Sequence, residues 1–269
     1  MALFHCPFCD KEIPETRGFC FCKKCALVFN TRWQTDTYGD AYFTDVYRQQ
    51  YGKSYEEDFD AIYAQSMKRL SRIAAYVNRF SVEKKILDLG CAYGFFLKAA
   101  QDNGFSPHGI ELSAHAVAYA NKNFDFPVEN SSLEDCKDNK YPVLTFWYVL
   151  EHFREIRESF DKVCSMVEEG GVIAFSVPSW FGPSYLFHRR KWEKEHPKDH
   201  RADFSPKAIR QLLRKKGFGA ISIVPASFHP ERLISRSMFM YPLFAFLYRL
   251  FSYVTGFGDT IEVYACKRK

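Results

Sequence analysis

The stretch that decides the fold is ILDLGCAYGFFL, residues 86–97. It begins as an apolar strand that carries Asp88, turns through Gly90 and Gly94, and continues into further apolar residues. In a parallel α/β sheet, ligands bind at the carboxyl ends of the strands, and the first strand–helix turn is the usual cradle. Glycine lets the backbone approach a ligand closely. The stretch therefore predicts a strand followed by a ligand-binding turn.

A dinucleotide-binding turn would read G-x-G-x-x-G, with a pyrophosphate at the helix amino terminus. Reading from Gly90, the second and third glycine positions hold Ala92 and Phe95, so that fingerprint fails. Asp88, just ahead of the turn, is also unfavourable beside a pyrophosphate. Glu111 ends the next expected strand. The turn therefore does not favour a nicotinamide dinucleotide.

Strands and helices alternate on both sides of this turn. Strands are expected at 84–90, 107–112, 143–150, 172–178, 220–227 and 260–268. Helices are expected at about 58–80 and at 94–104, 113–124, 155–171 and 205–217, with Ser113 and Ser205 as amino-terminal caps. This alternation predicts an α/β fold with a mostly parallel, doubly wound sheet.

Five of the nine cysteines lie in the first 25 residues. Two C-x2-C pairs, Cys6/Cys9 and Cys22/Cys25, have 12 residues between them and together offer the ligands of a tetrahedral four-cysteine site. Zinc is the expected ion, and its role is expected to be structural, because four sulfur ligands leave no open position. Cys20 is either an alternative to Cys22 or a bystander. A loose cysteine-rich arm or a redox pair is the other interpretation of this segment.

The chain has 269 residues, of which 47% are hydrophobic and 26% charged, a globular balance that allows one large domain and a small appendage. The net charge of +5 permits an anionic or nucleic-acid partner but requires neither. The first residues show neither a basic n-region nor a long apolar h-region, and the cysteines are better suited to metal binding or to a core than to disulfides. These features predict a cytoplasmic protein.

Two segments stand apart from the alternation. Residues 33–80 begin with an aromatic stretch that holds seven aromatic side chains from Tyr38 to Phe59, and this region is either a lid over the main pocket or a linker packed on the surface. Residues 237–257 are apolar on most faces but contain Pro242 and Arg249. They are expected to form a buried helical insertion or an oligomer contact, with contact to a membrane surface as the alternative.

Several motifs resemble those of class I S-adenosylmethionine-dependent methyltransferases. DLGCAYG resembles the family motif D-x-G-x-G-x-G, with Ala92 at the middle glycine, and TFWYVLEHF resembles the family's fourth-strand segment. EEGGVIAFSVPS and HRADFSPKAIRQLLRKKGF resemble later segments, and CKKCALVFN resembles zinc ribbons fused ahead of certain methyltransferases. Tyr148 and Pro142 depart from the acidic residues common at their positions. The resemblance implies a Rossmann-like, seven-stranded domain at 81–269 behind a zinc ribbon at 1–32.

The resemblance also implies residues for an S-adenosylmethionine site. Asp88, Gly90, Ala92 and Gly94 would shape the methionine end, and Glu111 would bind the ribose. Four weaker candidates each have an alternative role in the core or on the surface: Leu112 at the adenine, Glu134 near the adenine amine, and Phe146 and Trp147 near the methionine and sulfonium groups.

Methyl transfer needs a general base only when the acceptor must lose a proton early. His152, which follows the fourth strand, and His200 are the candidates for such a catalytic role, since histidine titrates near neutral pH. A small-molecule acceptor is expected from the resemblance, for example a sugar nucleotide, a polyketide-like compound or a lipid precursor. The alternatives are a ribosomal RNA methyltransferase and a non-catalytic cofactor-binding protein.

Overall fold

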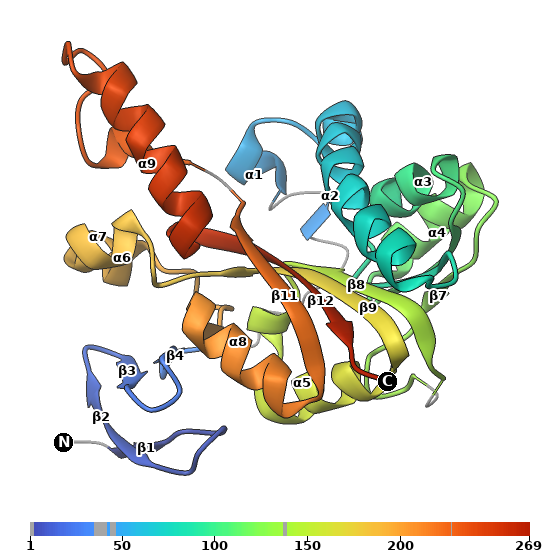
Figure 1. Ribbon diagram of the computed structural model, residues 1–269, viewed down its shortest axis with the longest axis horizontal. Coiled ribbons are helices and arrows are strands. Elements are labelled where there is room, and N and C mark those ends of the chain that lie inside the picture. Colours follow the sequence, from blue (N-terminus) through green and yellow to red (C-terminus); the bar gives the residue numbers. More distant parts are fainter. Residues whose placement is uncertain (1–2, 35–41, 44–46, 137–138, 227) are drawn as a thin grey trace. The chain divides into compact units, whose positions relative to one another are not determined.

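The computed structural model describes residues 3–34, 42–43, 47–136, 139–226 and 228–269 (Figure 1). Its larger sheet has seven strands in the order β11-β12-β9-β8-β5-β6-β7. Their bounds are Lys85–Leu89 (β5), Ser106–Glu111 (β6), Val128–Asn130 (β7), Tyr141–Trp147 (β8), Val167–Pro178 (β9), Phe218–Pro225 (β11) and Thr260–Lys267 (β12). The sheet is mixed and mostly parallel, and the fold is Rossmann-like, as the sequence predicts.

The chain divides into two compact units. The first, here called the glycine-turn unit, comprises Asp36–Trp147, Asp161–Ala174 and Tyr264–Lys269. The second, here called the ribbon unit, comprises Met1–Thr35, Tyr148–Phe160 and Phe175–Val263. The glycine turn and Glu111 belong to the first unit, whereas the cysteine pairs, His152 and His200 belong to the second.

In the glycine-turn unit, strand β5 lies between β6 and β8 and is parallel to both. Leu89 near the end of β5 pairs with Ile110 on one side and Phe146 on the other, so the three strands end close together. Leu87 and Leu144 are fully buried, as expected for strands covered on both faces. The helices of this unit include α1 (Tyr47–Tyr51), the 3₁₀ helix η2 (Glu56–Asp58), α2 (Phe59–Phe80), α3 (Phe95–Asp102) and α4 (Ala114–Asn123).

Both predicted helix caps are present. The Ser113 hydroxyl accepts a hydrogen bond from the amide of Ala116 at 3.1 Å at the start of α4. The Ser205 hydroxyl accepts one from the amide of Ala208, also at 3.1 Å, at the start of α8 (Pro206–Lys215). These bonds satisfy amide groups that have no partner within the helix.

Two element ends differ from the prediction. Helix α5 spans Ile156–Ser165 and does not continue to residue 171, because strand β9 already begins at the fully buried Val167. Gly171 lies inside β9, where an added Cβ would stand 2.8 Å from the carbonyl oxygen of Pro142. Gly170 and Gly171 therefore do not end a helix; they lie in β9 and permit a bend and a close strand contact. Strand β8 stops at Trp147, and the 3₁₀ helix η3 (Leu150–His152) replaces its predicted end.

The ribbon unit contains a separate five-stranded sheet in the order β1-β2-β3-β4-β10, whose strands pair antiparallel throughout. Their bounds are Leu3–His5 (β1), Glu12–Thr16 (β2), Phe19–Cys22 (β3), Leu27–Asn30 (β4) and Ala202–Asp203 (β10). Strand β10 adds to β4 with Ala202 opposite Phe29 and Asp203 opposite Val28. A segment from late in the sequence thus completes the sheet of the amino-terminal ribbon.

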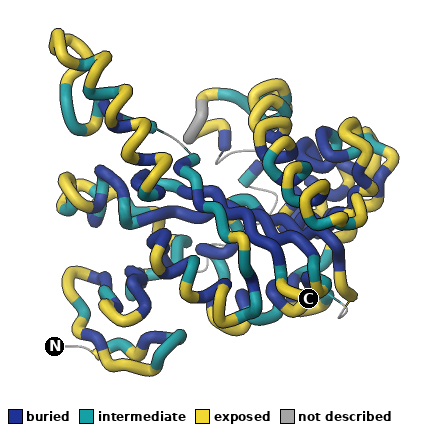
Figure 2. Tube along the Cα trace, viewed as in Figure 1, coloured by how far each residue is buried: buried dark blue, intermediate teal, exposed yellow. Residues whose placement is uncertain are grey.

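The remaining helices of the ribbon unit are α6 (Pro183–Phe187), α7 (Arg189–Glu195), η4 (Pro230–Arg232) and α9 (Tyr241–Thr255). The prediction of a buried insertion is wrong for α9, because most of its apolar side chains are exposed (Figure 2). Phe246 is 65% exposed and Val254 74%, and only Tyr248 and Ser252 are buried. Pro242 lies in the first turn, where its missing amide hydrogen is not needed, so it starts the helix and does not break it.

No helix in the described part of the chain combines the length and the apolarity that a membrane span requires.

Candidate functional site

The glycine turn is built from residues with left-handed backbone conformations. Gly90 has a φ of 68°, Ala92 of 51° and Gly94 of 79°. A non-glycine residue in this region costs about 1–2 kcal/mol, so Ala92 must be held in place by its surroundings. Its amide donates a hydrogen bond to the carboxylate of Glu111 at 2.9 Å. The side chain at the end of β6 therefore fixes the turn that follows β5.

Glu111 has both carboxylate oxygens bound to backbone amides. Oε2 accepts the bond from Ala92, and Oε1 accepts one from Ser113 at 2.9 Å. The residue is 2% exposed, and burial raises the pKa of this carboxyl although its bonds with Ser113 and Ala92 act in the opposite direction. A carboxylate has about four lone-pair positions, so each oxygen can still accept a second hydrogen bond, for example from a ribose hydroxyl.

Asp88 is a second buried carboxyl on the neighbouring strand. It is 1% exposed, and its Oδ1 accepts a 2.6 Å hydrogen bond from the hydroxyl of Thr145 on β8. Burial raises the pKa of Asp88 to about 7, with Glu111 acting in the same direction and Thr145 and Arg69 opposing. The guanidinium of Arg69 lies 4.0 Å from the ring centre of Trp147. Two buried acids at the ends of adjacent strands form a place that favours a bound cation.

Aromatic side chains pack against this turn. Phe43, Tyr93 and Phe95 belong to one buried cluster, and Tyr55 packs on it with its ring centre 5.0 Å from that of Tyr93. Burial raises the pKa of Tyr55, and Tyr42, Tyr47, Glu111 and Asp88 act in the same direction. Tyr38, the first aromatic residue of the proposed lid, lies outside the described residues. The described part of the segment at 42–59 therefore packs on the glycine turn, as a lid or a packed linker would.

The four weaker candidates of the cofactor site differ from one another in how far their side chains are exposed. Leu112 is 54% exposed beside the end of β6, where a flat ring would find an apolar surface. Trp147 is partly buried, with its ring centre 5.2 Å from that of Phe96. Phe146 is 1% exposed and belongs to the core. Glu134 is exposed, and its backbone carbonyl accepts a hydrogen bond from Lys162.

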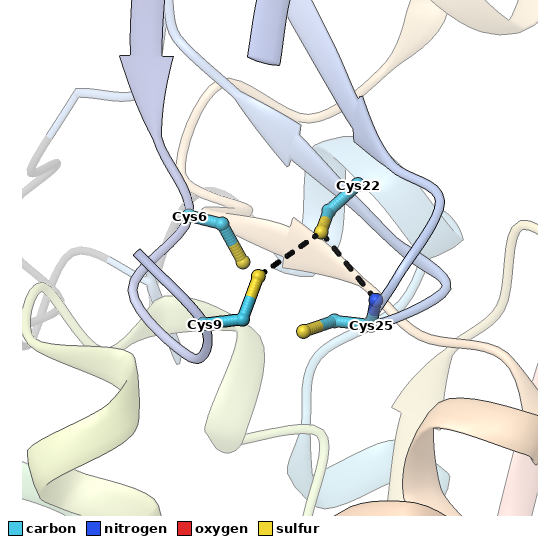
Figure 3. Close-up of side chains that lie close together, drawn as sticks. All are labelled: Cys6, Cys9, Cys22 and Cys25. Carbon is cyan, nitrogen blue, oxygen red and sulfur yellow. Dashed lines mark hydrogen bonds between the residues drawn. The ribbon is translucent and has the colours of Figure 1, made fainter. Parts of the chain in front are cut away.

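Four cysteine side chains converge in the ribbon unit (Figure 3). The sulfur atoms of Cys6, Cys9, Cys22 and Cys25 all lie within 4.8 Å of one another, and those of Cys9 and Cys22 are 3.6 Å apart. Cys20 is fully buried in β3 and does not belong to this group. The structure thus brings together the four cysteines that the sequence pairs predict as metal ligands.

The two C-x2-C turns have the same backbone design. The amide of Asp10 bonds to the carbonyl of Cys6 at 2.8 Å, and the amide of Ala26 bonds to that of Cys22 at 2.7 Å. Asp10 and Ala26 have positive φ values of 56° and 55°. Burial raises the pKa of Cys6 to about 12, and crowding by Cys22 adds to the effect. Four thiols at this spacing, three of them buried and that of Cys9 partly buried, are arranged as ligands of a tetrahedral metal ion.

A second cluster of ligand-type side chains surrounds η3 in the ribbon unit. One carboxylate oxygen of Glu151 and one ring nitrogen each of His152 and His200 lie within 4.8 Å of one another. The two imidazole ring centres are 4.9 Å apart and nearly perpendicular. The backbone brings them together, since the amide of Arg201 donates to the carbonyl of Glu151 at 2.6 Å. The two histidines predicted as catalytic are therefore neighbours.

Burial sets the charge states of this cluster. It raises the pKa of Glu151 to about 7, against the effect of His152, and lowers the pKa of His200 to about 4, with His152 acting in the same direction. Burial also disfavours a charged His152, but the hydrogen bond with Asp199 and the carboxyl of Glu151 together raise its pKa. The Nδ1 atom of His152 and Oδ2 of Asp199 are 3.2 Å apart. Because its pKa is lowered to about 4, His200 is neutral at neutral pH.

His196, whose ring centre is 5.8 Å from that of His200, has both ring nitrogens close to protein oxygens. Nε2 lies 2.7 Å from the carboxylate of Asp203, and Nδ1 lies 2.9 Å from the carbonyl of Pro197. The sequence prediction gave no role to Thr145, which bonds to Asp88, or to Glu151 and Asp199, which lie beside His152. The pattern VLEH contains Glu151 beside His152, but only the fold shows that its side chain is buried near His200.

The methyltransferase-domain family matches residues 56–223 of the chain. A similar solved structure is a SAM-dependent methyltransferase from Archaeoglobus fulgidus, with 16% identity, a TM-score of 0.55 and coverage of 85% of this chain and 100% of that one. Magnesium protoporphyrin IX methyltransferase from Synechocystis PCC 6803 has 13% identity, a TM-score of 0.55, and coverage of 85% and 97%.

The plantazolicin methyltransferase BpumL, bound to SAH and a substrate analogue, has 13% identity, a TM-score of 0.54, and coverage of 85% and 93%. No curated protein matches the chain significantly. At these identities the solved structures establish the fold, and the family match covers more than half of the chain. The buried acid pair and the glycine turn lie within the matched residues, and the chain belongs to the methyltransferase-domain family as a class I S-adenosylmethionine-dependent methyltransferase.

Proposed function

We propose that this chain transfers the methyl group of S-adenosylmethionine to a small-molecule acceptor. The observation that carries the cofactor part is the pair of buried carboxyls, Asp88 and Glu111, which flank a left-handed turn at the ends of adjacent parallel strands. S-Adenosylmethionine brings a sulfonium and an ammonium group, and both are favoured by buried negative charge. A pyrophosphate would be repelled there.

Each residue of the turn has a proposed task in binding. Glu111 accepts the ribose hydroxyls with its remaining lone pairs, while its bonds to Ala92 and Ser113 keep it oriented. Asp88 faces the methionine end, with Thr145 holding one carboxylate oxygen. Gly90 and Gly94 let the backbone approach the cofactor, and Leu112 offers an apolar surface to the adenine.

The remaining predicted residues have lesser tasks in this proposal. Trp147 borders the sulfonium region, whereas the buried Phe146 supports it from the core. Glu134 is proposed to lie near the adenine amine, and His152 and His200 are proposed to act on the acceptor. When bound, the cofactor supplies a carbon already activated by positive sulfur, so the chain mainly needs to align the two reactants and exclude water. Phe43, Tyr55 and Phe59 are proposed to serve as that cover.

The small-molecule acceptor is supported by fold-level analogy and not by a pocket of known shape. The similar enzymes are named for magnesium protoporphyrin IX and plantazolicin, and neither is a nucleic acid. The net charge of +5 is small for binding a polyanion. A ribosomal RNA acceptor is therefore the second candidate, to be decided by the acceptor experiment.

We further propose that Cys6, Cys9, Cys22 and Cys25 hold a structural zinc ion. All four thiols converge, and a zinc ion favours their deprotonated form despite burial. Purified protein should contain one tightly held zinc ion at this site. Substituting Cys22 by serine should release it and lower the melting temperature, because the short ribbon depends on the ion for folding.

Calorimetric titration with S-adenosylmethionine and S-adenosylhomocysteine tests the cofactor site. We expect micromolar binding to the wild type and at least tenfold weaker binding to Glu111→Ala and Glu111→Gln, while the exposed control Glu83→Ala should bind normally. Melting curves must first show that each variant is folded. Absence of binding to either ligand by folded wild-type protein would overturn the cofactor assignment.

The acceptor class is tested with S-adenosylmethionine that carries a labelled methyl group. The protein is incubated with a cell extract separated into a low-molecular-mass fraction and total RNA. Label in the low-mass fraction supports the proposal. Label in RNA would replace it with the RNA methyltransferase alternative, and no transfer to either fraction by protein that binds the cofactor would favour a non-catalytic role.

A further inference from the structure

The cluster around Glu151 contains a buried carboxyl group. Glu151 is 0% exposed, and neither carboxylate oxygen has a hydrogen-bond partner among the described residues. Burying such a group without compensation costs several kcal/mol. One ring nitrogen of His152 and one of His200 lie within 4.8 Å of a carboxylate oxygen of Glu151. A carboxylate that faces two imidazoles in a buried place has the composition of a metal site.

We propose that Glu151, His152 and His200 bind a divalent transition-metal ion of the zinc type. Two imidazoles and one carboxylate are a ligand set that zinc uses in sites with an open coordination position. Magnesium and calcium prefer oxygen ligands, so the two nitrogen ligands argue against them. This ion is separate from the one proposed for the four cysteines, and its ligands are nitrogen and oxygen instead of sulfur.

The surroundings of His152 support this assignment. Its Nδ1 atom lies 3.2 Å from the carboxylate of Asp199, which orients the ring; Nε2 is the nitrogen that we assign to the ion. A carboxylate on the far nitrogen is the usual partner of a metal-bound histidine, and it raises the basicity of the ligand. His196, by contrast, has both nitrogens bound to protein oxygens and is excluded as a ligand.

The loop that carries His200 is held by the ribbon. The amide side chain of Asn30 donates to the carbonyl of His200 at 3.1 Å, and the indole of Trp33 donates to that of Asp199 at 2.9 Å. On the other side, the amide of Arg201 bonds to Glu151. In a tetrahedral zinc site the ligand atoms are about 3.3 Å apart, so the present spacing needs to close by up to about 1.5 Å. Rotations of the three side chains would have to supply that movement.

Three protein ligands leave at least one coordination position for water or another oxygen ligand. A bound metal ion lowers the pKa of a water molecule or hydroxyl group at this position. The two histidines would then act as ligands of the ion.

Cobalt(II) binding tests the site without any cofactor or acceptor, so it is independent of the proposed function. Zinc-loaded protein is treated with a weak chelator and titrated with Co²⁺, with bound metal and visible absorption recorded. We expect about one Co²⁺ per chain with the weak bands of nitrogen and oxygen ligands and no thiolate charge-transfer band. Glu151→Gln and His200→Ala should lose this ion, and Asp199→Asn should bind it about 10- to 100-fold more weakly.

The matched control is His188→Ala, which removes an exposed histidine of the same unit and should leave Co²⁺ binding unchanged. Circular dichroism and retained cysteine-bound zinc show that each variant is folded. X-ray absorption at the zinc edge of fully zinc-loaded wild-type protein gives a result that does not depend on any variant. Only sulfur neighbours in that spectrum, or Co²⁺ binding that is unchanged in folded Glu151→Gln and His200→Ala, would overturn the proposal.

Discussion

Replacing Asp88 by asparagine should change how the stability of this protein depends on pH. Asp88 is 1% exposed, and burial raises its pKa from 3.8 to about 7 despite the hydrogen bond from Thr145. Because the folded-state pKa is above the unfolded-state value, the folded protein keeps a proton between about pH 4 and 7 that the unfolded chain has lost. The stability linked to this proton is fully present at low pH and is lost as the pH rises through about 7.

The size of the effect follows from the shift. Within the window between the two pKa values, each pH unit lowers the free energy of unfolding by about 1.4 kcal/mol. From pH 5 to pH 8 the wild type should therefore lose about 3 kcal/mol through Asp88 alone. Asparagine keeps the shape and an oxygen for the Thr145 hydroxyl, but it cannot ionise. The unfolding free energy of Asp88→Asn minus that of the wild type should rise by the same amount over this range.

Urea denaturation at pH 5, 6, 7 and 8 measures this difference without a cofactor. Asp125→Asn, which changes an exposed carboxyl of the same unit, serves as the control and should show no such trend. Comparing differences also cancels the contribution of other titrating groups, such as Glu151, that both proteins share. Parallel curves for the wild type and Asp88→Asn would show that Asp88 ionises normally in the folded protein, and the argument from its burial would be refuted.

Three further predictions concern the caps, the turn and the ribbon. Ser113→Ala should lower the free energy of unfolding by about 1 kcal/mol in thermal melts, while Ser113→Thr, which keeps the capping oxygen, should lose less; equal losses would contradict the cap. Gly94→Ala should destabilise more than Gly217→Ala, because both have positive φ but only the Cβ at residue 94 would meet an aromatic ring, at 3.1 Å; the reverse order in urea titrations would refute this. Cys20→Ala should leave the zinc content unchanged, whereas Cys22→Ala should reduce it; a metal assay that shows equal loss would assign both thiols to the site.

The features that the sequence predicts well depend on short stretches of chain. The caps Ser113 and Ser205 bond to amides three residues ahead, so their role needs only local geometry. The two C-x2-C turns likewise fix where their sulfurs point, and the glycine turn follows directly from strand β5. Local chemistry of this kind can be inferred from residue type and spacing alone.

The features that the sequence does not predict depend on packing between distant segments. Glu151 and His200 are far apart in the sequence but neighbours in the fold, where a backbone bond from Arg201 joins η3 to a later loop. Helix α9 looks like a core element by composition, yet nothing in its residues says whether another part of the chain covers it. The left-handed backbone of Tyr148, with a φ of 59°, also arises from its tertiary surroundings, since its amide bonds to the hydroxyl of Ser176.

The pairing of β4 with β10 has a consequence for how the chain folds during synthesis. Strand β4 ends at Asn30, whereas its partner begins at Ala202, about 170 residues later. At a synthesis rate of about 5–20 residues per second, the ribosome needs roughly 10–35 s to add the residues between them. During that interval the amino-terminal sheet presents an open edge to its surroundings. A nascent chain should therefore be most vulnerable to wrong strand pairing, and most dependent on early metal capture, before strand β10 has emerged.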